Sequence, residues 1–267
     1  TLEKAAETMA DQTLSAEDRL AAGDNPTIAA LHETHPLRDG ISPSQPQRFK
    51  VERPKSSFAA WYQFFPRSEG ATIDPNTGKI IQGTLKTSMA GLERAAAEGF
   101  DIVYLPPVFP IGVTNRKGRN NTLVAGPDDP GSPFGIGSEL GGHDTVDPLL
   151  GTMDDFKALC QRAHELGLEI ALDFALQCSP DHPWVKAHPN WFRHKPDGSI
   201  AFAENPPKKY QDIYPIDFNA DMPGIEKEVE RIMNLWIEAG VTIFRIDNPH
   251  TKPVRFWQDV IAAVTKK

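Results

Sequence analysis

The sequence predicts an α/β fold in which helices cover a parallel sheet. Short apolar segments alternate with segments whose apolar residues recur at helical spacing, which is the pattern of consecutive βαβ units. Three of the helical segments end in a glycine followed by an apolar residue, at Gly99, Gly167 and Gly240. Glycine suits the left-handed position just after a helix. The strand segments are almost continuously apolar, as expected for parallel strands buried on both faces.

Four strands and four helices are expected to alternate along most of the chain. One helix would begin after Thr152, where Asp155 three residues later completes a variant of the capping box. Another carries an apolar stripe that runs from Ile225 to Trp236. The expected strands cover residues 58–65, 102–105, 170–176 and 243–246, and the expected helices cover residues 84–98, 153–166, 225–239 and 253–264.

The beginning of the chain has a different character. Residues 1–35 show apolar residues at helical spacing, and the Asp-Asn-Pro sequence at residues 24–26 is typical of a helix start. Residues 36–54 are polar and rich in proline, which predicts a linker or an edge extension. We therefore expect a helical segment with its linker over residues 1–45 and an α/β domain over residues 46–267.

The connections between the predicted elements are strongly unequal in length. Helix-to-strand links are very short, whereas the strand-to-helix links 106–151 and 177–224 are long and hold many of the 24 prolines and 20 glycines. In parallel α/β folds, the loops that leave the carboxyl ends of the strands carry the functional site. These two loops are therefore the expected location of the chemistry.

Composition excludes several classes of protein. With 28 basic and 36 acidic side chains in 267 residues, the net charge is −8, and a duplex nucleic-acid binder would need a basic face. No apolar run approaches the roughly 20 residues of a membrane helix, and the charged first twenty residues do not resemble a secretory signal. Only two cysteines, Cys160 and Cys178, are present, which fits a reducing, cytoplasmic location. We expect no nucleic-acid or membrane partner.

Two aspartates stand at predicted strand ends. Asp173 and Asp247 each follow an apolar run, where a carboxylate must face a polar cleft or be paired. Arg245 lies two residues before Asp247, so the two side chains point to the same side of the strand. A guanidinium there would keep Asp247 ionised, as nucleophilic attack on an anomeric carbon requires. A purely structural Arg–Asp pair fits the same spacing equally well.

Three ordered stretches resemble one enzyme superfamily. The Phe-Arg-Ile-Asp-Asn-Pro-His sequence at residues 244–250 resembles the fourth-strand signature of the α-amylase superfamily, glycoside hydrolase family 13. Residues 144–152 resemble the stretch before the second helix of that superfamily, and residues 163–173 resemble the run into its third strand. The resemblance covers roughly residues 58–267. It implies a TIM (β/α)₈ barrel, of which this chain would hold the first half, strands 1–4, with long βα loops and a preceding helical segment.

Departures from the superfamily pattern narrow the resemblance. After Asp173, the usual Asn and His are replaced in the Phe-Ala-Leu-Gln-Cys-Ser sequence, and Asn248 stands where a small apolar residue is usual. Together with residues 114–121 and 204–212, these departures resemble the bacterial maltosyltransferases of the superfamily. The resemblance implies transfer of maltosyl units from α-maltose 1-phosphate to the non-reducing end of an α-1,4-glucan, with retention of configuration and release of phosphate.

The resemblance also implies roles for individual residues. Asp247 would be the nucleophile that forms a β-maltosyl–enzyme intermediate, and Arg245 would orient it. Asp173 would be a structural member of the cleft. The donor would be bound by Lys117, Gln177, Asp212 and Asn248, its phosphate contacted by Asn205, Lys208 and Tyr210, and the sugar of the first subsite contacted by His143 and Asp144.

The charges of the two long loops fit a phosphorylated donor. One loop carries Arg116, Lys117 and Arg119, the other carries Lys208 and Lys209, and both leave the same face of the predicted sheet. Such side chains can hold a phosphate leaving group. Charge runs are otherwise solvated surface, and we assign Lys209 to that class.

Several other candidates are better explained by packing. Trp184, Trp191 and Phe192 could stack on sugars or form a loop core. The histidines at 182, 188 and 194 lack the spacing of metal ligands, so we expect no metal and no cofactor. The Gly-Ile-Gly sequence at residues 135–137 lacks the pattern of a dinucleotide site. Cys178 has no evident partner base. Residues 1–35 resemble a helical module that contributes to a homodimer in the full-length maltosyltransferases.

The expected mechanism needs a group that the sequence does not supply in a matching motif. Retaining transfer requires a second carboxyl group about 5–5.5 Å from the nucleophile, and the resemblance implies that it comes from the fifth barrel strand, with another aspartate on the seventh. We therefore expect the isolated chain to be inactive. A hydrolase of α-glucans of the same superfamily, or a non-catalytic fragment that only binds carbohydrate, are the alternatives.

Overall fold

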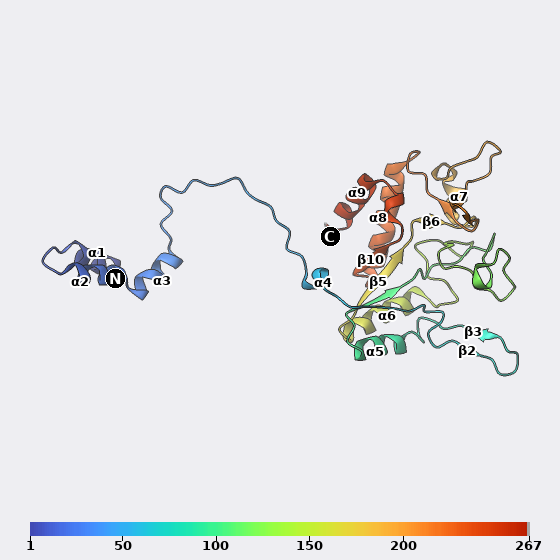
Figure 1. Cartoon of the computed structure of the whole chain (residues 1–267), viewed down its shortest axis with the longest axis horizontal. Helices are drawn as coiled ribbons and strands as arrows, with labels where there is room; N and C mark the ends of the chain where they lie inside the picture. Colours follow the sequence, from blue (N-terminus) through green and yellow to red (C-terminus); the bar gives the residue numbers. More distant parts are fainter. Residues whose placement is uncertain (266–267) are drawn as a thin grey trace. The chain divides into compact units, whose positions relative to one another are not determined.

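The computed structural model describes residues 1–265 (Figure 1). The chain divides into two compact units, Thr1–Val51 and Glu52–Lys267, which are treated separately below. Among the described residues, no helix combines the length and the apolar character that crossing a lipid bilayer demands.

The first unit consists of short helices that end in a segment without regular structure. Side-chain caps explain two of the starts, because the Ser15 side chain accepts from the amide of Asp18 and the Asn25 side chain accepts from the amide of Thr27. The helices expected over residues 1–35 are confirmed, and residues 35–53 form neither helix nor strand. The helices are α1 (Leu2–Ala10), α2 (Ala16–Gly23) and α3 (Pro26–Thr34).

The second unit is built on a four-stranded parallel sheet, as the alternation of apolar segments predicted. The strand order is β1-β4-β5-β10, and every neighbouring pair is parallel. The register of the last pair sets Arg245 directly beside Asp173 on the adjacent strand. The strands are β1 (Trp61–Gln63), β4 (Ile102–Leu105), β5 (Glu169–Phe174) and β10 (Ile243–Ile246).

Helices follow the strands of this sheet, and short antiparallel strand pairs lie in the connections between them (Figure 1). Helix α5 packs against α6, and α8 packs against α9. The helices are α4 (Pro54–Ser57), α5 (Met89–Ala97), α6 (Met153–Glu165), α7 (Pro183–Ala187), α8 (Met222–Glu238) and α9 (Val254–Val264). The antiparallel pairs are β2 (Thr72–Ile73) with β3 (Ile80–Ile81), β6 (Gln177–Cys178) with β9 (Tyr214–Pro215), and β7 (Ala203–Asn205) with β8 (Lys208–Tyr210).

Helix boundaries differ from the prediction where side chains bind nearby backbone. The capping box of Thr152 and Asp155 is present in full, and α6 begins where it was expected. Helix α5 begins later than expected, because residues 84–88 form a turn in which the Ser88 hydroxyl donates to the carbonyl oxygen of Thr84. Helix α8 begins earlier, because the Asp221 side chain accepts from the amide of Gly224.

The core joins helix α8 to the long loop after β4. The predicted apolar stripe of α8 is buried along its whole length, and Trp236 is fully buried against Phe109 and Phe156. The Trp236 indole also donates to the carbonyl oxygen of His143 at 2.7 Å. The loop that carries candidate site residues is thereby fixed to the core.

The glycines after the helices adopt the left-handed backbone that the sequence predicted. Gly99, Gly167 and Gly240 have φ values of +82°, +77° and +107°. A side chain at Gly167 would meet open space, whereas a Cβ atom at Gly240 would lie 2.7 Å from the Cβ of Cys160. These two positions therefore separate the conformational role of glycine from its packing role.

We predict that Gly167→Ala destabilises the chain by about 1 kcal/mol through the cost of the left-handed backbone alone. Gly240→Ala should cost about 3 kcal/mol, because Cys160 must also move in a packed interior. The free energies of unfolding from urea titration test the difference. Equal losses in the two variants would contradict the packing argument.

Candidate active site

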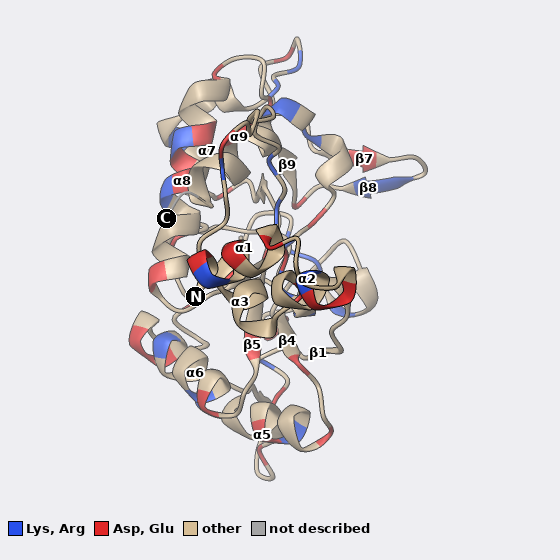
Figure 2. Ribbon diagram, turned by 90° about the vertical axis from the view of Figure 1, so that its left-hand side faces the viewer, with Lys and Arg blue, Asp and Glu red and all other residues tan. Residues whose placement is uncertain are grey.

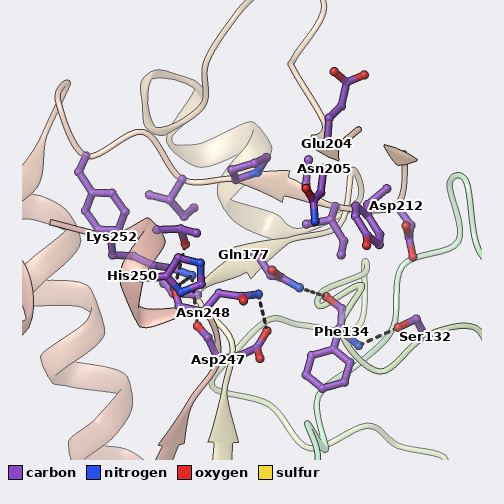
Figure 3. A pocket seen from close by; sticks show the side chains of 18 of the residues that line it. Ser132, Phe134, Gln177, Glu204, Asn205, Asp212, Asp247, Asn248, His250 and Lys252 are labelled. Atoms are coloured by element: carbon purple, nitrogen blue, oxygen red, sulfur yellow. Dashed lines mark hydrogen bonds between the residues drawn. The ribbon is translucent and has the colours of Figure 1, made fainter. Parts of the chain in front are cut away.

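A pocket of about 730 Å³ lies at the carboxyl ends of β5 and β10 (Figure 3). Its walls come from both long loops and from the turn after β10, as the unequal connections predicted. Of the residues proposed from the sequence, it brings together Gln177, Asn205, Tyr210, Asp212, Asp247 and Asn248.

A shared guanidinium connects the two strand-end carboxylates. One guanidinium nitrogen of Arg245 donates to Asp247 at 2.6 Å and to Asp173 at 2.9 Å. The phenol of Tyr104 on β4 donates to the same oxygen of Asp173. Asp247 is the member of this network that lines the pocket. The arrangement delivers an oriented carboxylate to the pocket and holds a second carboxylate on the neighbouring strand.

The buried member of the network has a perturbed acidity. Asp173 is fully buried, and one of its carboxylate oxygens has no hydrogen-bond partner. Desolvation by burial raises the pKa of Asp173 to about 6, although the hydrogen bond from Tyr104 and the charge of Arg245 both lower it. Asp173 is therefore a structural carboxylate that holds Arg245 rather than a group that faces the pocket.

We predict a pH-dependent stability from Asp173. Its raised pKa means that the folded state binds the proton more tightly, so the stabilising contribution is complete below about pH 4 and is lost as the pH rises through about 6. The unfolding free energy of the wild type minus that of Asp173→Asn should fall by about 2 kcal/mol from pH 4 to pH 7.

The control for this prediction has the opposite sign. Hydrogen bonds from the Thr152 backbone and hydroxyl lower the pKa of Asp155, so the advantage of the wild type over Asp155→Asn should grow as the pH rises and be lost in acid. A pH-independent difference for Asp173→Asn would contradict the raised pKa.

The residue after Asp247 shapes the site through its backbone as well as its side chain. Asn248 is left-handed, with φ +46° and ψ +53°, which asparagine tolerates better than most residues. Its side-chain amide donates to the second carboxylate oxygen of Asp247 at 3.0 Å (Figure 3). Both oxygens of Asp247 are thus held, one by Arg245 and one by Asn248.

The carboxylate of Asp212, which lines the pocket, lies close to the buried Lys117. Lys117 is 5% exposed, its ammonium donates to the side-chain oxygen of Gln211 at 2.8 Å, and it lies 4.0 Å from a carboxylate oxygen of Asp212. That oxygen of Asp212 has no hydrogen-bond partner, and burial raises the pKa of Asp212 while Lys117 lowers it. An unpartnered buried acceptor beside the pocket is suited to the hydroxyl group of a ligand.

Asp181 fastens one long loop to the other. Its carboxylate accepts from the amides of Val113 and Thr114 at 2.6 and 2.7 Å, and from the Thr114 hydroxyl at 2.6 Å. These bonds lower the pKa of Asp181 against the effect of burial. The loop leading to Lys117 is held by this contact, so Asp181 positions a pocket residue without lining the pocket.

We predict that Asp181→Ala exposes this loop to protease. Loss of bonds to a charged, partly buried acceptor should lower the local opening free energy by about 2 kcal/mol, which speeds tryptic cleavage after Arg116 and Lys117 by about 30-fold. Asp181→Asn keeps one accepting oxygen and should give a smaller effect. Asp197→Ala, which removes an exposed turn contact to Ser199, is the matched control and should leave cleavage unchanged. Equal cleavage rates for all variants would rule out the fastening role.

The β7–β8 hairpin forms an outer wall of the pocket. Asn205 and Tyr210 line it, whereas the exposed Lys208 does not. Figure 2 shows acidic β7 beside basic β8, and Glu204 lies 4.0 Å from Lys209. This exposed pairing agrees with the assignment of Lys209 to the solvated surface.

Two of the proposed sugar-binding residues lie outside the pocket lining. His143 is 1% exposed, and its ring nitrogens pair with His182 at 3.0 Å and with the carbonyl oxygen of Ala175 at 2.9 Å. Asp144 pairs with Arg231 on α8 at 2.7 Å. These contacts tie the loop to its surroundings instead of directing both side chains into the cavity.

The buried group of His143, Cys178 and His182 has the composition of a cation site. Its nitrogens are, however, already used. His143 donates to the Ala175 carbonyl and so accepts from His182, whose other nitrogen accepts from the amide of Trp184 at 3.0 Å. Burial lowers the pKa values of His143 to about 4 and of His182 to about 2. Two neutral, fully paired imidazoles fit a structural relay better than a metal.

Sequence reasoning missed several pocket residues. Lys252 and His250 follow β10, and the carbonyl oxygen of Phe134 accepts from the side-chain amide of Gln177 at 2.9 Å (Figure 3). The position of Lys252 and His250 beside the strand-end motif was an available signal. The loop aromatics Trp184, Trp191 and Phe192 are buried, which matches the packing interpretation.

No family model matches the chain. Over all of its 267 residues it is 78% identical to an α-1,4-glucan:maltose-1-phosphate maltosyltransferase of Bifidobacterium animalis subsp. lactis, of which it covers 36%. It is 56% identical over 97% of its length to maltosyltransferase 1 of Streptomyces coelicolor, of which it covers 38%. It is also 52% identical over 92% of its length to the maltosyltransferase of Mycobacterium tuberculosis, of which it covers 35%. The resemblance to maltosyltransferases is confirmed, and the chain spans little more than a third of these relatives.

Solved structures with the same arrangement are α-amylase family enzymes. An α-amylase from Lactobacillus plantarum aligns with a TM-score of 0.62 and 28% identity, over 78% of this chain and 42% of that one. A maltogenic α-amylase from Thermotoga neapolitana aligns with a TM-score of 0.60 and 26% identity, over 78% of this chain and 43% of that one. The parallel sheet and its helices are thus shared with α-amylase family enzymes.

Proposed function

We propose that this chain contributes the nucleophile and much of the donor site of a retaining maltosyltransferase, which moves maltosyl units from α-maltose 1-phosphate to α-1,4-glucans. The observation that carries the proposal is the carboxylate of Asp247, which lines the pocket and is held by Arg245 and Asn248. The high identity to maltosyltransferases along the whole chain supports the choice of donor and acceptor. The four strands would be the first half of a (β/α)₈ barrel.

The first step is attack on the sugar. A carboxylate oxygen of Asp247 forms a bond to the anomeric carbon of the donor, the bond from that carbon to the phosphate oxygen breaks, and its electron pair leaves with the phosphate. Arg245 stabilises the ionised nucleophile before attack and keeps its orientation. In the second step, the terminal 4-hydroxyl oxygen of a glucan forms a bond to the anomeric carbon, and the bond from that carbon to Asp247 breaks with its electron pair returning to the carboxylate. The hydroxyl proton passes to a second carboxyl group that acts as general base.

The pocket residues divide between the two parts of the donor. Gln177 and Asp212, which line the pocket, would bind sugar hydroxyls, and the buried Lys117 would support donor binding from beside Asp212, 4.0 Å away. Asn205 and Tyr210 would contact the phosphate, with Lys208 joining them from the edge of the hairpin. His143 and Asp144 would act on the first subsite through the loop that they anchor.

Proton transfer needs a second carboxyl group about 5–5.5 Å from the nucleophile. Besides Asp247, the carboxyl residues lining the described pocket are Glu204, near Lys209 on an exposed hairpin, and Asp212, beside Lys117. Neither occupies a strand end beside Asp247. We therefore propose that the acid/base comes from outside these 267 residues and that the isolated chain does not turn over.

A chimera tests the proposal. Residues 1–267 replace the matching segment of the Bifidobacterium animalis relative, and phosphate release from α-maltose 1-phosphate is followed with glycogen as acceptor. We expect phosphate release with glucan elongation, a loss of at least about 10³-fold in Asp247→Asn, and full activity in the surface variant Asp197→Asn.

Other results of this experiment would support one of the alternative functions. Release of free maltose without longer glucans would favour a hydrolase. An inactive chimera, in a background where the unmodified relative is active, would favour a carbohydrate-binding role. Turnover by the isolated chain would contradict the proposed need for an external carboxyl group.

A further inference from the structure

Lys252 brings a positive charge to the pocket floor from the segment that follows β10. It lines the pocket (Figure 3) and is partly buried. Its ammonium donates to the backbone carbonyl oxygens of Asp247 at 3.3 Å and Asn248 at 3.2 Å. Its hydrogen bonds thus go to the turn that carries the nucleophile, and not to a carboxylate side chain.

This turn has an unusual backbone that needs support. Asn248 is left-handed although it precedes a proline, and residues before proline favour extended conformations. The carbonyl oxygen of Asn248 also accepts from the Thr251 hydroxyl at 2.8 Å, and that of Pro249 accepts from the Trp257 indole at 3.3 Å. Lys252 is the charged member of this set, and charged donors form the stronger bonds.

The electrostatic setting of Asp247 includes groups from three strands and from the turn. Arg245 on β10 contacts it directly, while Asp173 on β5 and Tyr104 on β4 contact that arginine or its partner. Lys252 faces it from the turn. Burial lowers the pKa of Lys252, and the negative charge of Asp247 raises it.

We propose that Lys252 is a positioning residue, whose ammonium holds the left-handed turn so that Asp247 and Asn248 point into the pocket, and whose charge supports the ionised nucleophile. The proposal rests on the proposed maltosyl transfer for its catalytic consequence. Its structural part, the restraint of residues 247–251, stands independently of that function.

A role in the turn differs measurably from a role as a phosphate ligand. Lys208 lies on the exposed hairpin, where it would contact only the leaving group of the donor. α-Maltosyl fluoride keeps the anomeric carbon and the sugar but replaces the phosphate. Loss of a phosphate ligand should therefore vanish with this donor, whereas loss of a nucleophile-positioning residue should persist.

The experiment uses Lys252→Met and Lys252→Arg in the chimera described above, with α-maltose 1-phosphate and α-maltosyl fluoride as donors. We expect Lys252→Met to lower kcat by at least about tenfold with both donors, to change KM by less than about threefold, and to move the acidic limb of the pH–rate profile to higher pH. Lys252→Arg should recover part of kcat and return the acidic limb toward the wild-type position. Lys208→Met, the matched lysine control, should lose activity with the phosphate donor only.

Two results would overturn the proposal. One is an unchanged kcat in Lys252→Met, and the other is a loss confined to the phosphate donor. A wild-type chimera that is inactive with both donors would count against the proposed function instead.

In that case the inference is decided on the isolated chain by amide hydrogen exchange at residues 247–251. Lys252→Met should accelerate this exchange by at least about tenfold relative to the wild type, and unchanged protection would refute the restraint. Lys252→Gln, which keeps a donor on a side chain of similar length, serves as a second variant if Lys252→Met does not fold.

Discussion

A single nitrogen of the Arg245 guanidinium donates to carboxylates on two neighbouring strands, 2.6 Å from Asp247 and 2.9 Å from Asp173. The parallel register of β5 and β10 makes this possible, because it places Arg245 beside Asp173. Burying the Asp173 carboxylate without the guanidinium would cost folding free energy. Without Asp173, the guanidinium would lose one of the two carboxylates that hold its position. The sheet register therefore sets the direction in which the pocket carboxylate points.

The loops depend on a second layer of contacts that lies outside the pocket. Asp181 fastens the loop after β4, Lys117 and Gln211 join that loop to the wall of the pocket, and the Trp236 indole holds the His143 region against helix α8. Long loops that must present side chains accurately need such support, because they have no ladder of their own. The neutral pair of His143 and His182 belongs to the same support.

Patterns that depend on local sequence were predicted well. The bounds of β4 and β10, the capping box before α6 and the left-handed glycines all follow from short apolar runs or from backbone geometry at one residue. The start of α5 was wrong, because the Ser88 hydroxyl donates to the backbone carbonyl oxygen of Thr84 in a turn that precedes the helix. The hairpin of β2 and β3 was missed, since its two-residue strands carry no periodic signal.

The same distinction between local sequence and long-range contacts applies to the residues of the site. Asp247 and Arg245 could be found because a charge at the end of an apolar strand is informative by itself. Asp181 could not, because it binds backbone amides that only the fold brings into reach. Lys252 lies close to the strand-end motif in the sequence, but its contacts with the turn carbonyls depend on the fold. The same limit explains why Asp144, read as a sugar contact, is seen paired with Arg231.

The left-handed Asn248 has a consequence for how this position can vary. It must tolerate a positive φ before a proline and also donate an amide hydrogen to Asp247. Glycine meets the first demand without the second, glutamine offers the donor without the backbone tolerance, and aspartate would set a negative charge against the nucleophile. Asparagine satisfies both demands, so backbone geometry and the hydrogen bond to the carboxylate jointly favour it at position 248.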